Sequence, residues 1–212
     1  MGTKLEAVND VMRRVGKLPV TALDTGGNSA QALAELSLDD AGDRIQAQGW
    51  HWNTKKDVEL TPDGSDQVDV SALESGATLY HIDTYGASNH IDVKRVGDLL
   101  YDLGENQDTF PDVTELHITY VYEVIWADIP ETFVSWITAE AAREFRRRLA
   151  GNSWGQNRQE QASADRLMDE EVGRAMAAAT RDEIRSADVN VLETSGAKQL
   201  LGRPRMRNRS TH

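Results

Sequence analysis

Residues 128–151, DIPETFVSWITAEAAREFRRRLAG, decide how this chain is divided. Apolar side chains recur there with the three- and four-residue spacing of one helix face: Phe133, Trp136, Ile137, Ala141, Phe145 and Leu149. Asp128 stands where an N-cap is expected, Pro130 lies in the first turn, and Glu131 completes a capping-box arrangement. Gly151 is expected to end the helix. The pattern therefore predicts an amphipathic helix with well-marked ends.

The last turn of this predicted helix carries three consecutive arginines, Arg146, Arg147 and Arg148. The helix dipole favours positive charge at this end. Glu144 precedes Arg148 by four residues, which is the order that favours an ion pair along a helix. No catalytic group accompanies them, so the helix is predicted to serve as a rigid element.

Three more helical patterns lie on either side of this one. Residues 4–15 form the first, which is expected to end at Gly16. The second begins at a cap formed by Asn28 or Ser29 and runs to Gly49. The last, residues 158–185, is rich in alanine, and its narrow stripe of small apolar residues predicts close packing against a neighbour.

Between Trp50 and Asp128 the hydrophobic period changes to two. The alternation of Trp50, Trp52 and Thr54 is taken as the start of a strand, and residues 77–86 and 90–104 are expected to add further strands. Residues 113–126 alternate most clearly, with apolar side chains at Leu116, Ile118, Tyr120, Tyr122 and Val124. This alternation is typical of an antiparallel strand with one buried face.

The predicted fold class is therefore α+β. A four-helix bundle, residues 1–50 and 128–185, carries an antiparallel β-rich domain, residues 51–127, inserted between its second and third helices. Residues 186–212 are expected to form an extended C-terminal tail. Because the inserted domain leaves and re-enters at helix ends, those two ends are expected to lie close together.

Composition excludes several classes of protein. The chain has 212 residues and a formal net charge of −12, which disfavours binding to the outside of a nucleic acid. It has no cysteine, so disulfides, thiolate metal sites and cysteine nucleophiles are absent. No apolar run approaches the roughly 18 residues that span a bilayer. The N-terminal segment is charged and helical, unlike a signal peptide.

Candidate chemical residues are few, and we predict no catalytic, cofactor or metal site. No nucleotide-binding, serine-hydrolase or zinc-protease motif is present. His81 and His90 each precede an aspartate by two residues, a spacing that an exposed strand face produces without any metal. Trp50 and Trp52 enclose His51 and could stack on bases, but a hydrophobic hinge between the helices and the sheet is the favoured interpretation.

Three stretches together resemble a known family. They are AVNDVMRRVGKLPVTAL (residues 7–23), IQAQGWHWNT (residues 45–54) and the proline-led, arginine-ending helix at residues 128–151. In order and spacing they are similar to the tail tubular protein A family of short-tailed bacteriophages, also called the adaptor or head-to-tail connector. The resemblance covers roughly residues 5–185 and is weak in the C-terminal tail.

The resemblance implies a virion structural protein that is not an enzyme. Twelve copies would form a ring that joins the portal protein to the tail nozzle protein, and double-stranded DNA would pass through it without specific binding. It implies no cofactor and no membrane, and a location in the virion tail after assembly in the host cytoplasm. A channel lined with negative charge would keep passing DNA from adhering.

Two other functions remain open at this point. One is a virion-associated hydrolase of cell-wall or capsular polysaccharide that uses carboxylates of the β-rich domain. The other is a scaffolding protein that is absent from the mature particle. Turnover lost on single carboxylate substitutions would support the hydrolase, and mass spectrometry of purified particles separates the scaffold from the adaptor.

Two sets of residues are predicted to make contacts in the assembly. At least one of Arg146, Arg147 and Arg148 is expected to face an acidic patch on the next protomer, because the dipole and Glu144 do not account for all three. Residues 202–212 carry four arginines and no acid, whereas the other 201 residues carry a net charge of −16. This tail is expected to dock on the portal or on a neighbour through Leu200, Leu201, Arg203, Arg205, Arg207 and Arg209.

Overall fold

The computed structural model describes residues 3–23, 29–73, 77–84, 91–150 and 158–186. Within these ranges the chain forms four α-helices and five β-strands, so the α+β class is confirmed. The helices are α1 (Lys4–Arg14), α2 (Ser29–Gln46), α3 (Glu131–Ala150) and α4 (Arg158–Ser186). The strands are β1 (Thr54–Leu60), β2 (Leu79–Thr84), β3 (Val93–Val96), β4 (Leu99–Asp102) and β5 (Leu116–Tyr122).

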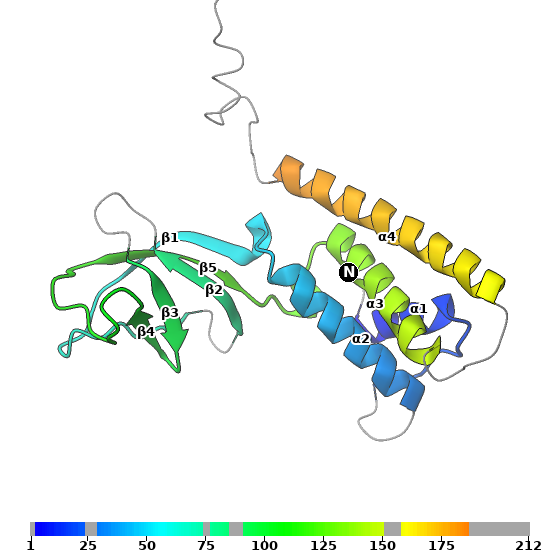
Figure 1. Ribbon diagram of the computed structural model, residues 1–212, viewed down its shortest axis with the longest axis horizontal. Coiled ribbons are helices and arrows are strands. Elements are labelled where there is room, and N and C mark those ends of the chain that lie inside the picture. Colours follow the sequence, from blue (N-terminus) through cyan, green and yellow to red (C-terminus); the bar gives the residue numbers. More distant parts are fainter. Residues whose placement is uncertain (1–2, 24–28, 74–76, 85–90, 151–157, 187–212) are drawn as a thin grey trace, which may run out of the picture.

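Helix α3 is the central helix and packs against α1, α2 and α4 (Figure 1). Its apolar stripe is the one expected from the sequence, with Phe133, Ile137 and Phe145 wholly buried. Alanines fill the contacts between the large side chains and allow the helices to approach closely. Thr3 and Glu6 cap α1 in a reciprocal capping box. One hydrophobic cluster thus spans all four helices.

The strands form a three-stranded antiparallel sheet, in the order β1–β5–β2, and a β3–β4 hairpin. In the central strand β5, Leu116, Ile118 and Tyr120 are buried and alternate with half-buried polar residues, as the sequence predicts. Val121 is also buried, although it breaks the alternation, because it lies against Gly49. The strands enclose a second hydrophobic cluster that is separate from the helical one.

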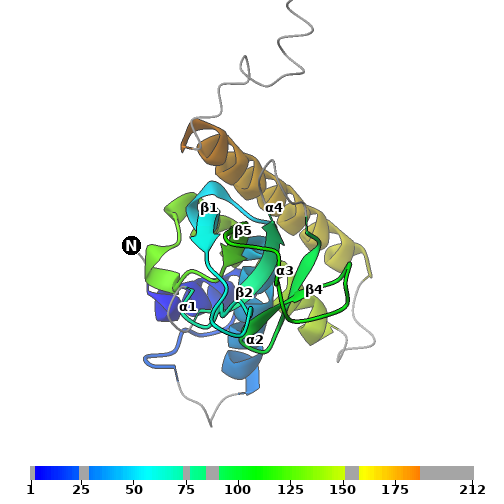
Figure 2. The same ribbon diagram turned by 90° about the vertical axis from the view of Figure 1, so that its left-hand side faces the viewer.

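The strand region lies at one end of the long axis and the helices at the other (Figure 1). Viewed from the strand end, α4 crosses behind the sheets on the far side of the molecule (Figure 2). No helix in the described part of the chain is long and apolar enough to cross a membrane.

Two local predictions were wrong. Asp128 does not cap α3, because it is the last residue of a short 3-10 turn, Trp126–Asp128, and the carbonyl of Pro130 accepts the first helical hydrogen bonds. The second error concerns Trp52, which lies in another 3-10 turn, His51–Asn53, before β1 begins at Thr54. In both places the chain passes from one hydrophobic cluster to the other. Hydrophobic periodicity along the sequence does not reveal such a crossing.

Candidate functional site

The three arginines at the end of α3 point in different directions, because successive helical residues rotate by about 100°. Arg146 Nε lies 3.2 Å from Asp165 Oδ1 on α4. Arg148 donates to Asp40 on α2 at 2.5 Å and to Glu144 at 2.7 Å, which confirms the predicted pair within the helix. Arg147 is exposed and makes no ion pair with any residue that the structure describes. Two of the three therefore link helices of the same chain.

Arg148 has the most partners of the three arginines. The hydrogen bond to Asp40 raises the pKa of Arg148 above its ordinary value, and Glu144 adds a smaller contribution. Its guanidinium also donates to Ser37 Oγ at 3.1 Å. Arginine is charged at every accessible pH. The contact between α2 and α3 is therefore not lost when the pH is raised.

Arg147 lies at the edge of a shallow hollow of about 350 Å³ between α2 and α3. Glu140 is almost wholly buried beneath it and pairs with both Arg143 and Arg44. Glu144 also lines the hollow and pairs with Arg44 and Arg148, so both glutamate charges are already neutralised. Arg147 consequently presents an uncompensated positive charge to whatever binds at this surface.

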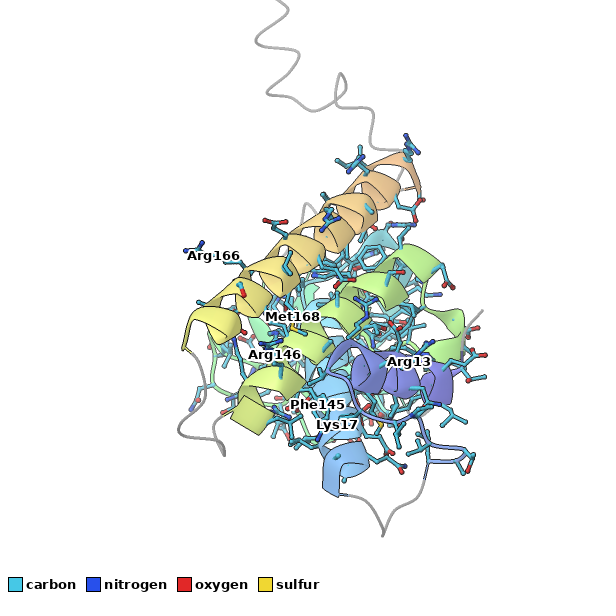
Figure 3. The ribbon with its side chains drawn as sticks, turned by 90° about the vertical axis from the view of Figure 1, so that its right-hand side faces the viewer. Arg13, Lys17, Phe145, Arg146, Arg166 and Met168 are labelled. Atoms are coloured by element: carbon cyan, nitrogen blue, oxygen red, sulfur yellow. The ribbon has the colours of Figure 1, made fainter. Side chains whose placement is uncertain are left out.

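Helix α4 is held to the rest of the chain mainly through polar contacts. Val172 and Ala179 are its buried apolar residues, whereas most of its other described side chains are exposed or half-buried. Five acids of α4 form a series of contacts with α1, α3 and the turn after α2: Asp165 with Arg146, Asp169 with Arg143, Glu171 with Arg14, Asp182 with Thr132, and Glu183 with His51. Figure 3 shows Arg146 and Met168 between α3 and α4.

These contacts were not predicted from the sequence, although a signal for them exists. Asp165, Asp169 and Val172 recur at spacings of four and three, so they share one face of α4. Arg143 and Arg146 show the same three-residue spacing on α3. Recognising the match requires knowing that the two helices lie antiparallel and side by side, and only the fold provides that information.

The region around Trp50 acts as the predicted hydrophobic hinge. Trp50 stacks edge-on against Phe133 at 4.9 Å and against Trp136 at 5.7 Å, and Trp52 stacks on Phe133 at 5.1 Å. Trp50 and Trp52 are half-buried and pack on aromatic side chains of α3, which favours the hinge over a base-stacking platform. The tryptophans join the sheet to the helical core.

Hydrogen bonds from side chains to backbone complete this hinge. Asn53, which is wholly buried, donates to the carbonyls of Gln46 and Tyr122 and accepts from the Trp50 amide. The Gln46 side chain accepts from the Val124 amide at 2.8 Å. Because buried amides and carbonyls need partners, these two side chains replace the secondary-structure bonds that end at the junction.

A further contact joins strand β2 to helix α2. The Tyr80 hydroxyl donates to Asp43 Oδ1 at 2.9 Å. Burial raises the pKa of Tyr80, and this hydrogen bond raises it further. Sheet and helices are thus tied at two places, through the tryptophan hinge and through this tyrosine.

The candidate metal and acid–base residues do not converge. His81 pairs with Asp83 at 2.6 Å on an exposed strand face, and His90 lies outside the described residues. Among the residues described, no three histidine or acidic side chains are placed to hold a metal ion. Asp102, a buried carboxylate of the strand region, accepts the Gly104 and Glu105 amides and so shapes a turn.

The predicted docking residues of the C-terminal tail also lie outside the described residues. They are Leu200, Leu201, Arg203, Arg205, Arg207 and Arg209. Their proposed contact rests on the sequence alone.

The family follows from comparison with known proteins. The family model described as tail tubular protein matches residues 5–188, which include all of the helices and strands that the structure describes except the first residue of α1. The chain belongs to this family, whose members are structural proteins of bacteriophage tails, and the resemblance drawn from the sequence is confirmed. A search of curated proteins finds no match to the chain.

Proposed function

We propose that the protein is the adaptor of a phage tail, a ring of about twelve copies that joins the portal protein to the tail nozzle protein. The match to the tail tubular protein family over residues 5–188 carries this proposal. The fold supports it, because a central helix cross-linked to three others gives each copy the fixed shape that a ring of repeated contacts needs. In this assembly the helices serve as a bundle that carries the strand region as an inserted domain.

The charge distribution suits a channel for DNA. Residues 51–127 contain 4 basic and 15 acidic side chains, a net charge of −11, which is almost the whole net charge of the chain. Like charges repel, so an acidic wall keeps double-stranded DNA from adhering during ejection. We infer that DNA passes this surface without specific binding.

Arg147 is our candidate for the contact between protomers. Its two neighbours are engaged within the chain, whereas its own side chain is exposed and unpaired among the described residues. In the ring it would face a carboxylate of the next copy. An exposed pair contributes only about 0.2–1 kcal/mol, but the contact is repeated around the ring.

Electron microscopy of the protein mixed with its portal tests the adaptor function. We expect rings bound to one face of the portal and co-sedimentation of the two proteins. Arg147→Glu should weaken assembly without lowering the melting temperature, whereas Lys17→Glu, an equal charge change on another exposed residue, should not. A protein that neither forms rings nor binds the portal would refute the proposal.

The C-terminal tail is proposed to dock on the portal or on an adjacent protomer. Truncation after Ser186 removes all six predicted docking residues and leaves the described helices and strands intact. The truncated protein is expected to stay folded and to lose co-sedimentation with the portal. Equal binding by the full and truncated chains at matched salt would show that the tail has no such role.

A further inference from the structure

Helix α4 has a second face that its contacts with the rest of the chain leave uncovered. Arg174, Arg181 and Arg185 are separated by seven and four residues, which places them within about 40° of one another on the helix. All three are exposed, and they lie opposite the buried residues Val172 and Ala179. The arginine stripe, as we call these three residues, covers about 17 Å of helix.

The arginine stripe is not neutralised within the chain. None of its members forms an ion pair with a described residue, although Asp165, Asp169 and Glu171 of the same helix are paired. Arg174 and Arg181 instead donate to carbonyls of their own helix, at 3.3 and 3.0 Å. Arg166, which flanks the stripe, also extends away from α3 (Figure 3).

Apolar side chains accompany the stripe. Ile184 is 51% exposed and Leu167 is 63% exposed, on the same outer half of the helix. Ala177 and Ala178 are exposed between the arginines and would let another surface approach closely. Arginine combined with exposed apolar residues is the composition typical of a protein interface and is less typical of a surface that only meets water.

A complementary surface lies in the strand region. The loops 103–115 and 61–66 lie at the strand end of the long axis, far from α4 (Figures 1 and 2). Glu105 and Asp112 line a hollow of about 480 Å³ there, together with the apolar residues Phe110 and Val113. Neither acid makes an ion pair with a described residue, and both are exposed. Asp66 lies beside this hollow, since its carbonyl accepts the Phe110 amide.

We propose that the arginine stripe of one copy docks on the acidic hollow of a second copy of this chain. The two surfaces match in charge. Pro111 and Val113 line the hollow beside its acids, as Leu167 and Ile184 accompany the stripe. The stripe lies beside the junction of helices and strands, where Glu183 contacts His51, whereas the hollow lies at the strand end (Figure 1). The two surfaces are apart within one molecule, so they meet only between copies. Such a contact joins unlike surfaces of successive copies, and it closes into a ring when the rotation per copy allows. The inference rests on the proposed ring and names a second pair of surfaces in it, besides the contact proposed for Arg147.

Charge exchange tests the contact. One variant carries Arg174→Glu, Arg181→Glu and Arg185→Glu, and another carries Glu105→Lys and Asp112→Lys. Each alone places like charges at every contact, so each should weaken self-association in sedimentation velocity by on the order of 10- to 100-fold. Mixed in equal amounts, the two variants should assemble in alternation and recover most of the lost association.

A matched control separates this contact from net charge. Lys17→Glu, Lys56→Glu and Lys94→Glu make the same change in net charge at exposed positions outside the stripe. This variant should associate like the wild type, and the melting curves of all variants should show that each is folded. A control as defective as the stripe variant would overturn the proposal.

Other outcomes assign the stripe to a different partner and also overturn the proposal. One is intact self-association of the stripe variant with loss of portal binding. Another is intact self-association with lost binding of a 30-base-pair DNA duplex at low salt. If wild-type protein forms rings on the portal and the stripe variant does so equally, only this inference fails. If the wild type forms no ring and binds no portal, the adaptor function itself fails.

Discussion

The helical and strand regions of this protein differ in how far their charged side chains are paired. Residues 1–50 and 128–185 carry 14 basic and 18 acidic side chains, whereas residues 51–127 carry 4 and 15. In the helical region the arginines on facing helices pair with carboxylates, as Arg148 does with Asp40. In the strand region acids outnumber their possible partners. The comparison shows that the helical charges mainly hold the chain together, whereas the strand charges are directed outward.

The two regions also differ in how their cores are built. The helical cluster includes stacked aromatic rings at Phe133 and Trp136, and it extends beyond the helices to Trp52 and Trp126. The strand cluster is smaller and consists mainly of aliphatic side chains, from the strands and from the segments between them, such as Val68 and Val70. The boundary between the two cores therefore lies inside residues 51–127 and not at either end of that segment.

The largest expected effect is the difference between two deletions. Thr54 pairs with Val121 across β1 and β5, so their Cα atoms are about 5 Å apart and a short glycine linker can replace residues 54–122. This deletion keeps Trp52 and Trp126 and should preserve the helical circular dichroism. Deletion of residues 51–127 removes both half-buried tryptophans and should cost roughly 3 kcal/mol or more.

Thermal melts followed at 222 nm compare the two deletions directly. Equal loss of helical signal in both would mean that helices and strands share one core. Equal stability in both would mean that the tryptophans contribute nothing to the helical region.

A smaller effect is expected at the hinge. Gly49 has φ +76°, and a Cβ there would lie 3.0 Å from Val121 Cγ2, whereas Gly97 has φ +65° and open space around it. Either alanine costs about 1–2 kcal/mol for the left-handed backbone. Gly49→Ala should cost roughly 1–3 kcal/mol more, because the extra methyl group is crowded between helix and sheet. Urea denaturation measures both, and equal losses would show that the close approach at the hinge does not matter.

Weakening the contact between α3 and α4 should have a smaller effect than Gly49→Ala. Asp165→Asn and Asp169→Asn together remove two exposed ion pairs with α3, each contributing about 0.2–1 kcal/mol. Hydrogen exchange should become faster in α4 and stay unchanged in the strand region, and 0.5 M salt should act on the wild type in the same direction. Glu170→Gln is the control, since Glu170 is exposed and has no ion-pair partner among the described residues. Faster exchange in this control would argue against the docking role of the two aspartates.

The smallest effect concerns pH in the strand region. The hydrogen bond with Asp57 is the main cause that raises the pKa of His117, and Glu115 adds to it. A raised pKa in the folded state means that protonation of His117 stabilises the fold fully below the unfolded value of about 6.5. This stabilisation is lost as the pH rises through the folded value. The change is small because these groups are exposed to solvent.

Titration of His117 by NMR measures this pKa. Asp57→Asn should move its midpoint down toward 6.5, and asparagine tolerates the positive φ of 57° at that position. Asp83→Asn, which alters an acid beside a different histidine, should leave the midpoint unchanged. A midpoint that does not respond to Asp57→Asn would rule out the assigned cause.

The sequence by itself determined the parts of this protein that depend on neighbours close in the chain. The stripe containing Phe133, Ile137 and Phe145 predicted α3, and alternation predicted β5, because both periods follow directly from backbone geometry. Gly49 was expected to end the second helix. Helix α2 ends three residues earlier, at Gln46, but Gly49 does adopt the positive φ that glycine tolerates where the chain turns away. The predicted pair of Glu144 with Arg148 is local in the same sense.

Only the tertiary structure decided which charges are free. Arg148 meets Asp40, 108 residues away, and Arg146 meets Asp165 across the α3–α4 packing, so neither partner could be chosen from spacing along the chain. The same holds for Trp52, which lies in a turn and packs on Phe133 of α3. Long-range contacts depend on where whole helices and strands lie, and that arrangement follows from the burial of two hydrophobic cores at once. The fold thereby leaves Arg147 and the arginine stripe without ion-pair partners among the described residues.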